Sequence, residues 1–191
     1  MKCAMCADKQ CYNGKDCTNL KDEIRKEYAK KENQSIMSAA AAIEAEGYMK
    51  LTRIEELIVF CKKMGFKKLG LAFCIGLENE AKLVHEIFSK EFDVCSVCCK
   101  VCAFSKKDYG FKELEGGGKS SCNPIGQAKV LNTEKTDINI LLGLCVGHDI
   151  LFTEYSEAPV TTLAVKDRVL AHNPLGAIYS KYYRKRRFGV K

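Results

Sequence analysis

Four cysteines near the start of the chain have a spacing that suits a metal site. They give the pattern C-x2-C-x4-C-x5-C, at Cys3, Cys6, Cys11 and Cys17. Residues 1–20 carry few apolar side chains, and Asn13-Gly14 allows the tight loops that a four-thiolate site needs. We therefore predict that this segment is a metal-binding knuckle. It would hold zinc or an iron–sulfur cluster, in a structural or electron-relaying role.

A second set of cysteines is spread along the chain, each after a strand-like stretch or before a helix start. Its members are Cys74, Cys98, Cys99, Cys122 and Cys145. Ligands of open α/β sheets bind beyond the carboxyl ends of the strands, and parallel strands bring those ends to one edge. We therefore expect these thiols to converge at that edge. The helix start after Cys122 would also favour a thiolate and an anionic cofactor.

Helices and strands must alternate to position this second set. Strands are predicted over 68–74, 92–98, 138–144 and 160–165, and helices over 24–47, 53–64, 78–90, 124–131, 150–155 and 175–187. Gly47 is expected to end the first helix as its C′ residue, and Thr52 with Glu55 to cap the second, which Gly65 would end. This order predicts an α/β fold with a three-layer, mostly parallel sheet and flanking helices. We divide the chain into the knuckle (1–20), an α/β domain (21–180) and a basic tail (181–191).

Three kinds of chemistry suit the strand-end thiols. Clustered thiolates select iron–sulfur clusters, zinc or Cu(I) over hard cations. A 4Fe–4S cluster held by three of these thiolates would leave one iron open to a small substrate. Structural zinc is a second interpretation, and inert or redox-active thiols are a third, since free cysteine is often simply buried. Cys61, within a predicted helix, is assigned to the core.

The local run Cys95, Cys98, Cys99 and Cys102 does not suit one ion while the strand stays extended. Alternation along a strand places Cys95 and Cys99 on the face opposite Cys98 and Cys102. We expect Cys98 to be the ligand from this run, with Cys99 as the second choice.

Three further stretches carry polar or charged side chains that could do chemistry beside the cysteines. His148 and Asp149 follow Cys145 closely and would serve proton transfer beside a cofactor; alternatively Asp149 caps a helix and His148 lies in the loop. Residues 166–168 (Lys-Asp-Arg) suit an anionic substrate or ion pairs within the loop. GGGKSS (116–121) is not a phosphate loop, because Glu113 stands where that motif needs glycine, and we interpret it as a lid beside Cys122.

The charge of the chain is concentrated at its end. The net charge is +7, and residues 181–191 contain six Lys or Arg and no acidic residue. The tail interleaves these with tyrosines, a mixture that suits RNA contact but also a solvated helix end. No secretory signal and no membrane span is found, so we expect a cytoplasmic protein. Twelve thiols favour an anaerobic source.

Several phrases of the chain resemble a family of cysteine-rich proteins from anaerobic bacteria and archaea, a domain of unknown function. They are the N-terminal four-cysteine pattern, SVCCK (96–100), CNPIGQA (122–128), TDINILLGLCVGHD (136–149) and APVTTLAVKDRVLAHNP (158–174). The resemblance covers nearly the whole chain. It implies metal binding through cysteine and brings no established reaction.

The leading hypothesis is an iron–sulfur protein, with an open-site cluster at Cys98, Cys122 and Cys145 and with Cys74 or Cys99 as an additional ligand. As an enzyme it would be of lyase, desulfidase or redox type, acting on a small substrate. The alternative is a zinc-stabilised binding module without catalysis, which contacts RNA or a protein through residues 181–191.

Overall fold

Contacts divide the chain into two units, Met1–Leu51 and Thr52–Lys191, which are described separately. The structure is a computed structural model and describes residues 1–112, 115–116 and 118–190. The boundaries at residues 20 and 180 were drawn from composition and expected chemistry, and they stay predictions. No helix among the described residues combines the length and apolar character needed to cross a membrane.

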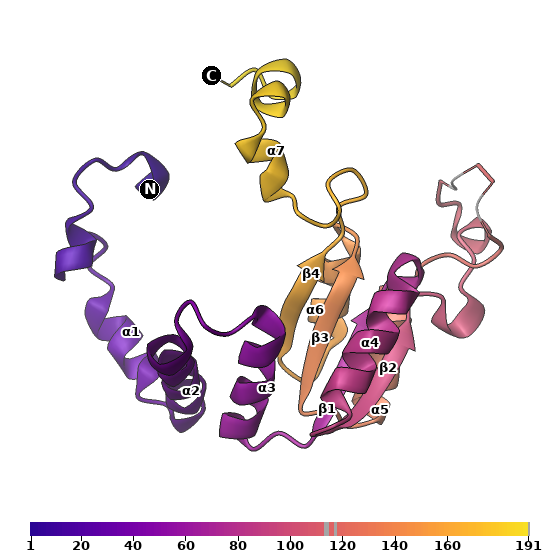
Figure 1. Cartoon of the computed structure of the whole chain (residues 1–191), viewed down its shortest axis with the longest axis horizontal. Helices are drawn as coiled ribbons and strands as arrows, with labels where there is room; N and C mark the ends of the chain where they lie inside the picture. The colour runs from indigo at the N-terminus through magenta and orange to yellow at the C-terminus, as the bar shows by residue number, and fades with distance from the viewer. Residues whose placement is uncertain (113–114, 117, 191) are drawn as a thin grey trace. The chain divides into compact units, whose positions relative to one another are not determined.

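Four parallel strands form the sheet of the second unit, in the order β2–β1–β3–β4 (Figure 1). They are β1 (Lys68–Phe73), β2 (Asp93–Cys98), β3 (Ile138–Leu144) and β4 (Val160–Val165). From β1 the chain first adds β2 on one side, then crosses to β3 and β4 on the other. The order therefore reverses between β1 and β3, which makes their carboxyl ends a topological switch point. The predicted parallel α/β fold is confirmed.

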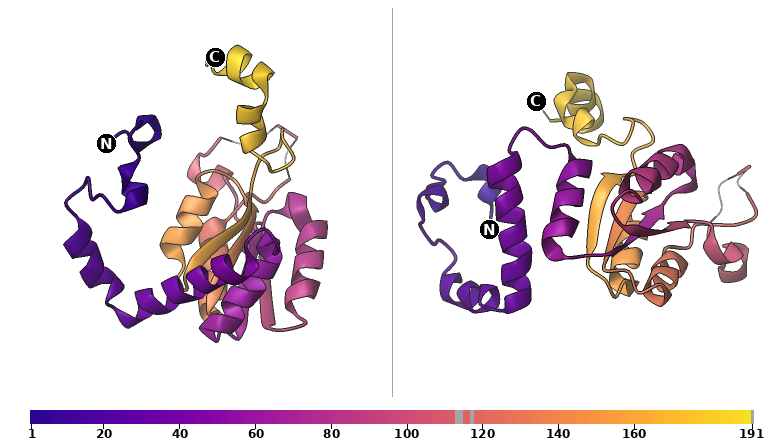
Figure 2. Two further views of the ribbon diagram at one scale, coloured as in Figure 1. Left: turned by 60° about the vertical axis from the view of Figure 1, so that its left-hand side comes forward. Right: turned by 60° about the horizontal axis from the view of Figure 1, so that its bottom comes forward.

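Helices cover both faces of the sheet and give the predicted three layers (Figures 1 and 2). The helices are α3 (Arg53–Met64), α4 (Glu78–Phe88), α5 (Pro124–Thr133) and α6 (His148–Tyr155). On one face, Leu57 of α3 and Phe88 of α4 pack with Leu71 of β1. On the other face, Leu131 of α5 and Phe152 of α6 form a second cluster together with Ala72 of β1 and Leu141 of β3. Adjacent strand residues thus face opposite layers, as the twofold period of a strand requires.

Local sequence signals set several helix ends. Thr52 and Glu55 form the predicted capping box of α3, and Gly65 ends that helix in the left-handed region at φ +73°. Pro124 begins α5, where the side chain of Asn123 accepts a hydrogen bond from Gly126 N at 2.8 Å. These caps fix where α5 starts, and therefore where Cys122 lies.

The predicted helix over 24–47 is two helices, α1 (Lys21–Tyr28) and α2 (Lys31–Gly47). Lys30, at φ −67° and ψ 130°, is extended and separates them. Gly47 is the last residue of α2 and not its C′ residue, so that detail was wrong. A Cβ on Gly47 would clash with the side chain of Leu51, so glycine serves packing there and not a left-handed turn.

The predicted helix over 175–187 is also interrupted. It consists of α7 (Leu175–Tyr179) and a π-helical turn over Tyr183–Arg187, because Ser180 takes an extended conformation with ψ 117°. In that turn, the guanidinium of Arg187 lies 4.9 Å from the centre of the Tyr183 ring. Lys191 lies outside the described residues.

Candidate functional site

The carboxyl edge of the sheet brings together cysteines from three separate segments. Cys74 follows β1, Cys99 follows β2, and Cys122 precedes α5. The Cys99 thiol is hydrogen-bonded to both Cys122 and Cys74. Its sulfur also accepts a hydrogen bond from Ile75 N at 3.4 Å, and the residue is only 3% exposed. Cys99 is therefore the centre of a three-thiol contact, which we call the edge cluster (Cys74, Cys99 and Cys122).

Backbone hydrogen bonds hold the segments of the edge cluster in place. Cys99 N donates to Phe73 O at 2.9 Å, and Asn123 N donates to Cys99 O at 2.8 Å. The amide Nε2 of Gln127, a fully buried residue of α5, donates to Phe73 O at 3.1 Å and to Val97 O at 2.8 Å. Gln127 thus joins the ends of β1 and β2 immediately before their cysteines.

Cationic and polar side chains lie against the edge cluster. Lys166, after β4, is hydrogen-bonded to Cys74, and His148, at the start of α6, is hydrogen-bonded to Cys122. Lys100 Nζ lies 3.9 Å from Cys122 Sγ and donates to Ser120 O at 2.8 Å. Positive charge beside sulfur stabilises the thiolate form.

These contacts separate the pKa values of the three thiols. The hydrogen bond from Cys99 lowers the pKa of Cys122 to about 4, helped by His148 and by the charge of Lys100. The hydrogen bond from Cys99 also lowers the pKa of Cys74 to about 5, with the amide of Gly76 and Lys166 contributing. The pKa of Cys99 itself is raised, chiefly because its thiol is hydrogen-bonded to Cys122, and next because it is hydrogen-bonded to Cys74 and buried. The contacts therefore favour the thiolate form of Cys122 and Cys74 and the protonated form of Cys99.

Cys145 lies at the same edge, after β3, and binds a different cation. Arg168 Nη2 donates to Cys145 Sγ at 3.0 Å. That hydrogen bond is the largest cause of a raised pKa of Arg168, followed by the charge of Cys145 and then by the charges of Cys74 and Cys122. Arg168 is therefore within electrostatic reach of cysteines from both sides of the switch point.

The other cysteines of the second unit lie apart from these contacts. Cys98, the ligand expected from the local run, pairs in register with Phe73, while its neighbour Cys99 joins the edge cluster. Cys95 packs beside the second core cluster, and Cys102 is exposed. Cys61 is fully buried, as expected of a core residue, and burial raises the pKa of its thiol to about 11.

His148 and Asp149 differ in their surroundings. His148 is the first residue of α6 and contacts Cys122, so it does not simply lie in the loop. Asp149 is inside the first turn, its Oδ1 accepts from Ile150 N at 2.9 Å, and the helix begins after Gly147 without a side-chain cap. The prediction that Asp149 caps this helix was wrong. Proton transfer by His148 and Asp149 stays a prediction.

The four N-terminal cysteines are all exposed. Cys3 and Cys11 lie on two short 3₁₀ helices, Cys3–Met5 and Gln10–Asn13, which bury no residue; Cys6 directly follows the first, and Cys17 lies in a bend beyond the second. Cys6 Sγ accepts a weak hydrogen bond from Lys9 N at 3.5 Å. Across the described residues, no three His, Cys, Asp or Glu side chains are already arranged to hold a metal ion. Metal binding by either set of cysteines therefore stays a prediction.

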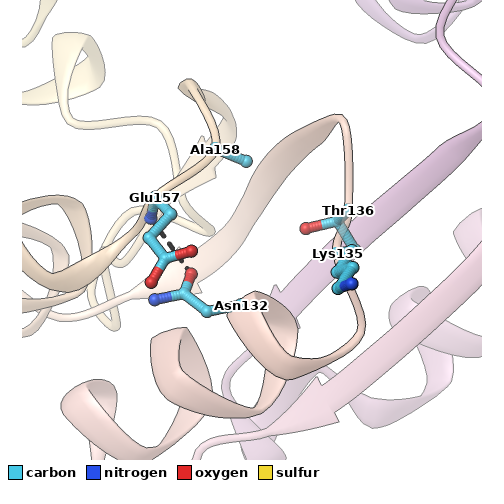
Figure 3. A pocket seen from close by; sticks show the side chains of 5 residues that line it. All are labelled: Asn132, Lys135, Thr136, Glu157 and Ala158. Carbon is cyan, nitrogen blue, oxygen red and sulfur yellow. Dashed lines mark hydrogen bonds between the residues drawn. The ribbon is translucent and has the colours of Figure 1, made fainter.

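A pocket of about 250 Å³ opens at the opposite, amino edge of the sheet (Figure 3). It is lined by Asn132, Lys135, Thr136, Glu157 and Ala158. Asn132 uses both ends of its amide internally, since it donates to Tyr155 O and accepts from Glu157 N. No cysteine lines this pocket, so it is separate from the carboxyl edge.

Sequence reasoning missed two residues of the edge. Lys100 follows directly after Cys98-Cys99, and that adjacency was a usable signal. Gln127 gave no such signal, because a glutamine inside a predicted helix is ordinary. The lid expected over 116–121 includes Gly117, which, like Glu113, lies outside the described residues. Of that segment, Ser121 N donates to Phe104 O at 2.7 Å.

Comparison with known proteins gives the chain a family. Residues 12–163 match the family model described as a protein of unknown function, DUF1847. An uncharacterised protein of Methanocaldococcus jannaschii, MJ0455, is 58% identical over 188 residues, which are 97% of each chain. No solved structure matches. The expected resemblance to an uncharacterised family with archaeal members is confirmed, and the chain belongs to the DUF1847 family.

Proposed function

We propose that this is a cytoplasmic iron–sulfur protein whose cluster is held at the carboxyl edge of the sheet and acts on a small substrate. Cys74, Cys99 and Cys122 would hold the cluster. The observation that carries the proposal is the meeting of these three thiols, from three separate segments, around the buried Cys99.

The donor set fits such a group by its chemistry. Thiolates are the ligands of iron–sulfur clusters, and the edge brings three cysteine thiols into contact, two of them with a lowered pKa. Hydrogen bonds to sulfur and nearby charge tune such clusters, and Ile75 N and Lys100 are placed for both roles. Loading requires that metal–sulfur bonds replace the hydrogen bonds among the thiols.

When bound by three thiolates, the cluster supplies one open iron that acts as a Lewis acid. The chain's own residues do the rest. Gln127 holds the two cysteine-bearing strand ends together, and Lys166 and Arg168 provide positive charge beside the sulfurs. His148 lies against Cys122, where it can hold or accept a proton.

The first test is strictly anaerobic purification followed by iron, sulfide and zinc analysis and an absorption spectrum. We expect about four iron and four sulfide per cluster and a broad band near ~400 nm. The decisive pair of variants is Cys99→Ala and Cys98→Ala, adjacent cysteines of which one belongs to the edge cluster. Cys99→Ala should lose the edge iron, and Cys98→Ala should keep it.

A Cys6→Ala/Cys11→Ala double variant removes two of the four N-terminal cysteines. Any iron that this variant still binds therefore belongs to the edge cluster. Zinc without iron in this double variant would overturn the iron–sulfur assignment in favour of a structural zinc site. Equal iron loss in Cys98→Ala and Cys99→Ala would overturn the choice of ligands.

A further inference from the structure

Two cations lie at the switch point without a carboxylate partner. Among the described residues, neither Lys166 nor Arg168 forms an ion pair with Asp or Glu, and both contact cysteines instead. Asp167, between them in sequence, turns away: its Oδ1 accepts from Val169 N at 2.9 Å and Leu170 N at 2.8 Å. The loop ion pairs that the sequence allowed are therefore not formed by this Asp.

The position of Lys166 is built by the sheet. Its backbone N donates to Leu144 O at 3.2 Å, which fixes it at the end of the β3–β4 pairing. Its Nζ lies 3.7 Å from where a Cβ would be on Gly143 of β3, and 3.7 Å from where one would be on Gly76, after β1. The side chain therefore extends from β4 over the end of β3 towards β1, across the switch point.

Gly143 makes this crossing possible. It has φ +69° inside β3, where the register with β4 shifts, and a Cβ there would clash with the side chain of Leu77. The bulge and the missing side chains leave the ammonium above the ends of the two central strands. In open α/β sheets this is the place where ligands bind.

We propose that Lys166 and Arg168 form a subsite that binds the carboxylate of a small organic anion at the switch point, beside Cys74 and Cys145. The inference rests on the proposed function only in treating this anion as the substrate of the cluster. Because neither Lys166 nor Arg168 is paired with a carboxylate among the described residues, both keep N–H groups that can donate to a further anion.

Carboxylate fits this arrangement better than phosphate. Arg168 uses Nη2 for Cys145, and its remaining N–H groups form the planar fork that matches a carboxylate. The Arg fork also matches phosphate, but many phosphate sites add free backbone amides at a helix start. At the start of α5 the amide of Gly126 is already bound by the Asn123 side chain, and Pro124 has none to offer.

The test is calorimetric titration of the anaerobically purified full-length protein with succinate. Its neutral analogue succinamide and inorganic phosphate are the comparison ligands. Arg168→Gln and Lys166→Gln should each weaken succinate binding by about tenfold or more, the loss typical of a charge-assisted hydrogen bond. Arg168→Lys, which keeps the charge and loses the fork, should fall between wild type and Arg168→Gln.

Lys135→Gln is the matched control, because Lys135 lines the amino-edge pocket, and it should change binding by less than about twofold. The proposal would be overturned if succinate showed no saturable binding or bound all variants with equal affinity. It would also be overturned if phosphate bound more tightly than succinate and its binding weakened in the same variants. Metal analysis of the same samples separates the two proposals. If the protein lacks iron but succinate binding still weakens in the Lys166 and Arg168 variants, the carboxylate subsite stands and the iron–sulfur function is overturned. If the protein contains iron but the variants bind succinate as wild type does, the iron–sulfur function stands and the subsite is overturned.

Discussion

The two sets of cysteines differ in what holds them. The edge cluster is fixed by β1, β2 and α5, with Cys99 buried and every segment tied by backbone hydrogen bonds. The N-terminal cysteines are exposed, in a segment whose two 3₁₀ helices bury no residue. One set is positioned before any ligand binds. The other would need a bound ligand to fix its geometry.

The two sets therefore differ in how much conformational entropy metal binding would have to offset. Fixing the backbone of a residue costs about 1–2 kcal/mol, and at the edge this cost is already offset by the two core clusters. In the N-terminal segment a bound metal would have to offset this cost, which a structural zinc can do with about 10–16 kcal/mol of binding. The edge is therefore suited to reactivity and the N-terminal segment to stabilisation by metal.

The largest expected effect concerns thiol reactivity in metal-free protein. Because the pKa of Cys122 is lowered to about 4, it is a thiolate throughout pH 6–8, and its alkylation rate should change by less than about twofold. A free cysteine standard with pKa about 8.5 should react about a hundredfold faster at pH 8 than at pH 6.

The measurement is iodoacetamide labelling followed by peptide mass analysis, with the exposed N-terminal cysteines in the same digest as a check on access. A hundredfold rise in the alkylation rate of Cys122 between pH 6 and pH 8 would show that its neighbours do not stabilise the thiolate. The two sets of cysteines would then not differ in their electrostatic surroundings.

The next effect concerns the residue that joins the strand ends. Gln127→Ala removes two hydrogen bonds from a fully buried site and leaves a cavity, so unfolding should become easier by about 2–4 kcal/mol. Urea denaturation of the metal-free protein measures this. Gln10→Ala, in the exposed N-terminal segment, should change stability by less than about 0.5 kcal/mol. Similar values for both variants would contradict the difference in scaffolding.

A smaller effect is expected from metal removal at the N-terminus. Trypsin should cleave after Lys9 and Lys15 about tenfold faster once a chelator has removed metal, because that segment buries no residue and is held only by exposed local contacts. Cleavage after Lys68 in β1 should not change, since the sheet does not depend on metal. Cleavage after Lys9 at one rate with and without metal would argue against an N-terminal metal site.

The smallest effect is expected from the tail. Ending the chain at Ser180 should leave the iron content unchanged, because the edge ligands all precede it. The same variant tests the alternative function. If the protein is instead an RNA-binding module, wild type should bind single-stranded RNA in a salt-dependent way and the shortened chain should not. Iron loss on shortening would instead connect the tail to the edge cluster.

The sequence predicted much of this fold because its signals are local. The apolar stretch before Cys145 had to be a buried strand, and Thr52 with Glu55 had to cap a helix. The breaks at Lys30 and Ser180 were missed, because each depends on one extended residue within a helical pattern. For the edge site, the sequence predicted only its location, because the carboxyl ends of parallel strands meet at one edge of the sheet.

Composition and spacing alone determined the α/β class and predicted that Cys74, Cys122 and Cys145 lie at one edge, and the resemblance of whole phrases indicated the family. Only the tertiary structure decided that Cys99 and not Cys98 meets the other thiols, that Gln127 joins the two strand ends, and that Lys166 reaches across Gly143. The physical reason is that spacing along a chain fixes which residues end a strand. The direction of a side chain beyond that end is set by bulges, caps and packing partners that lie far away in sequence.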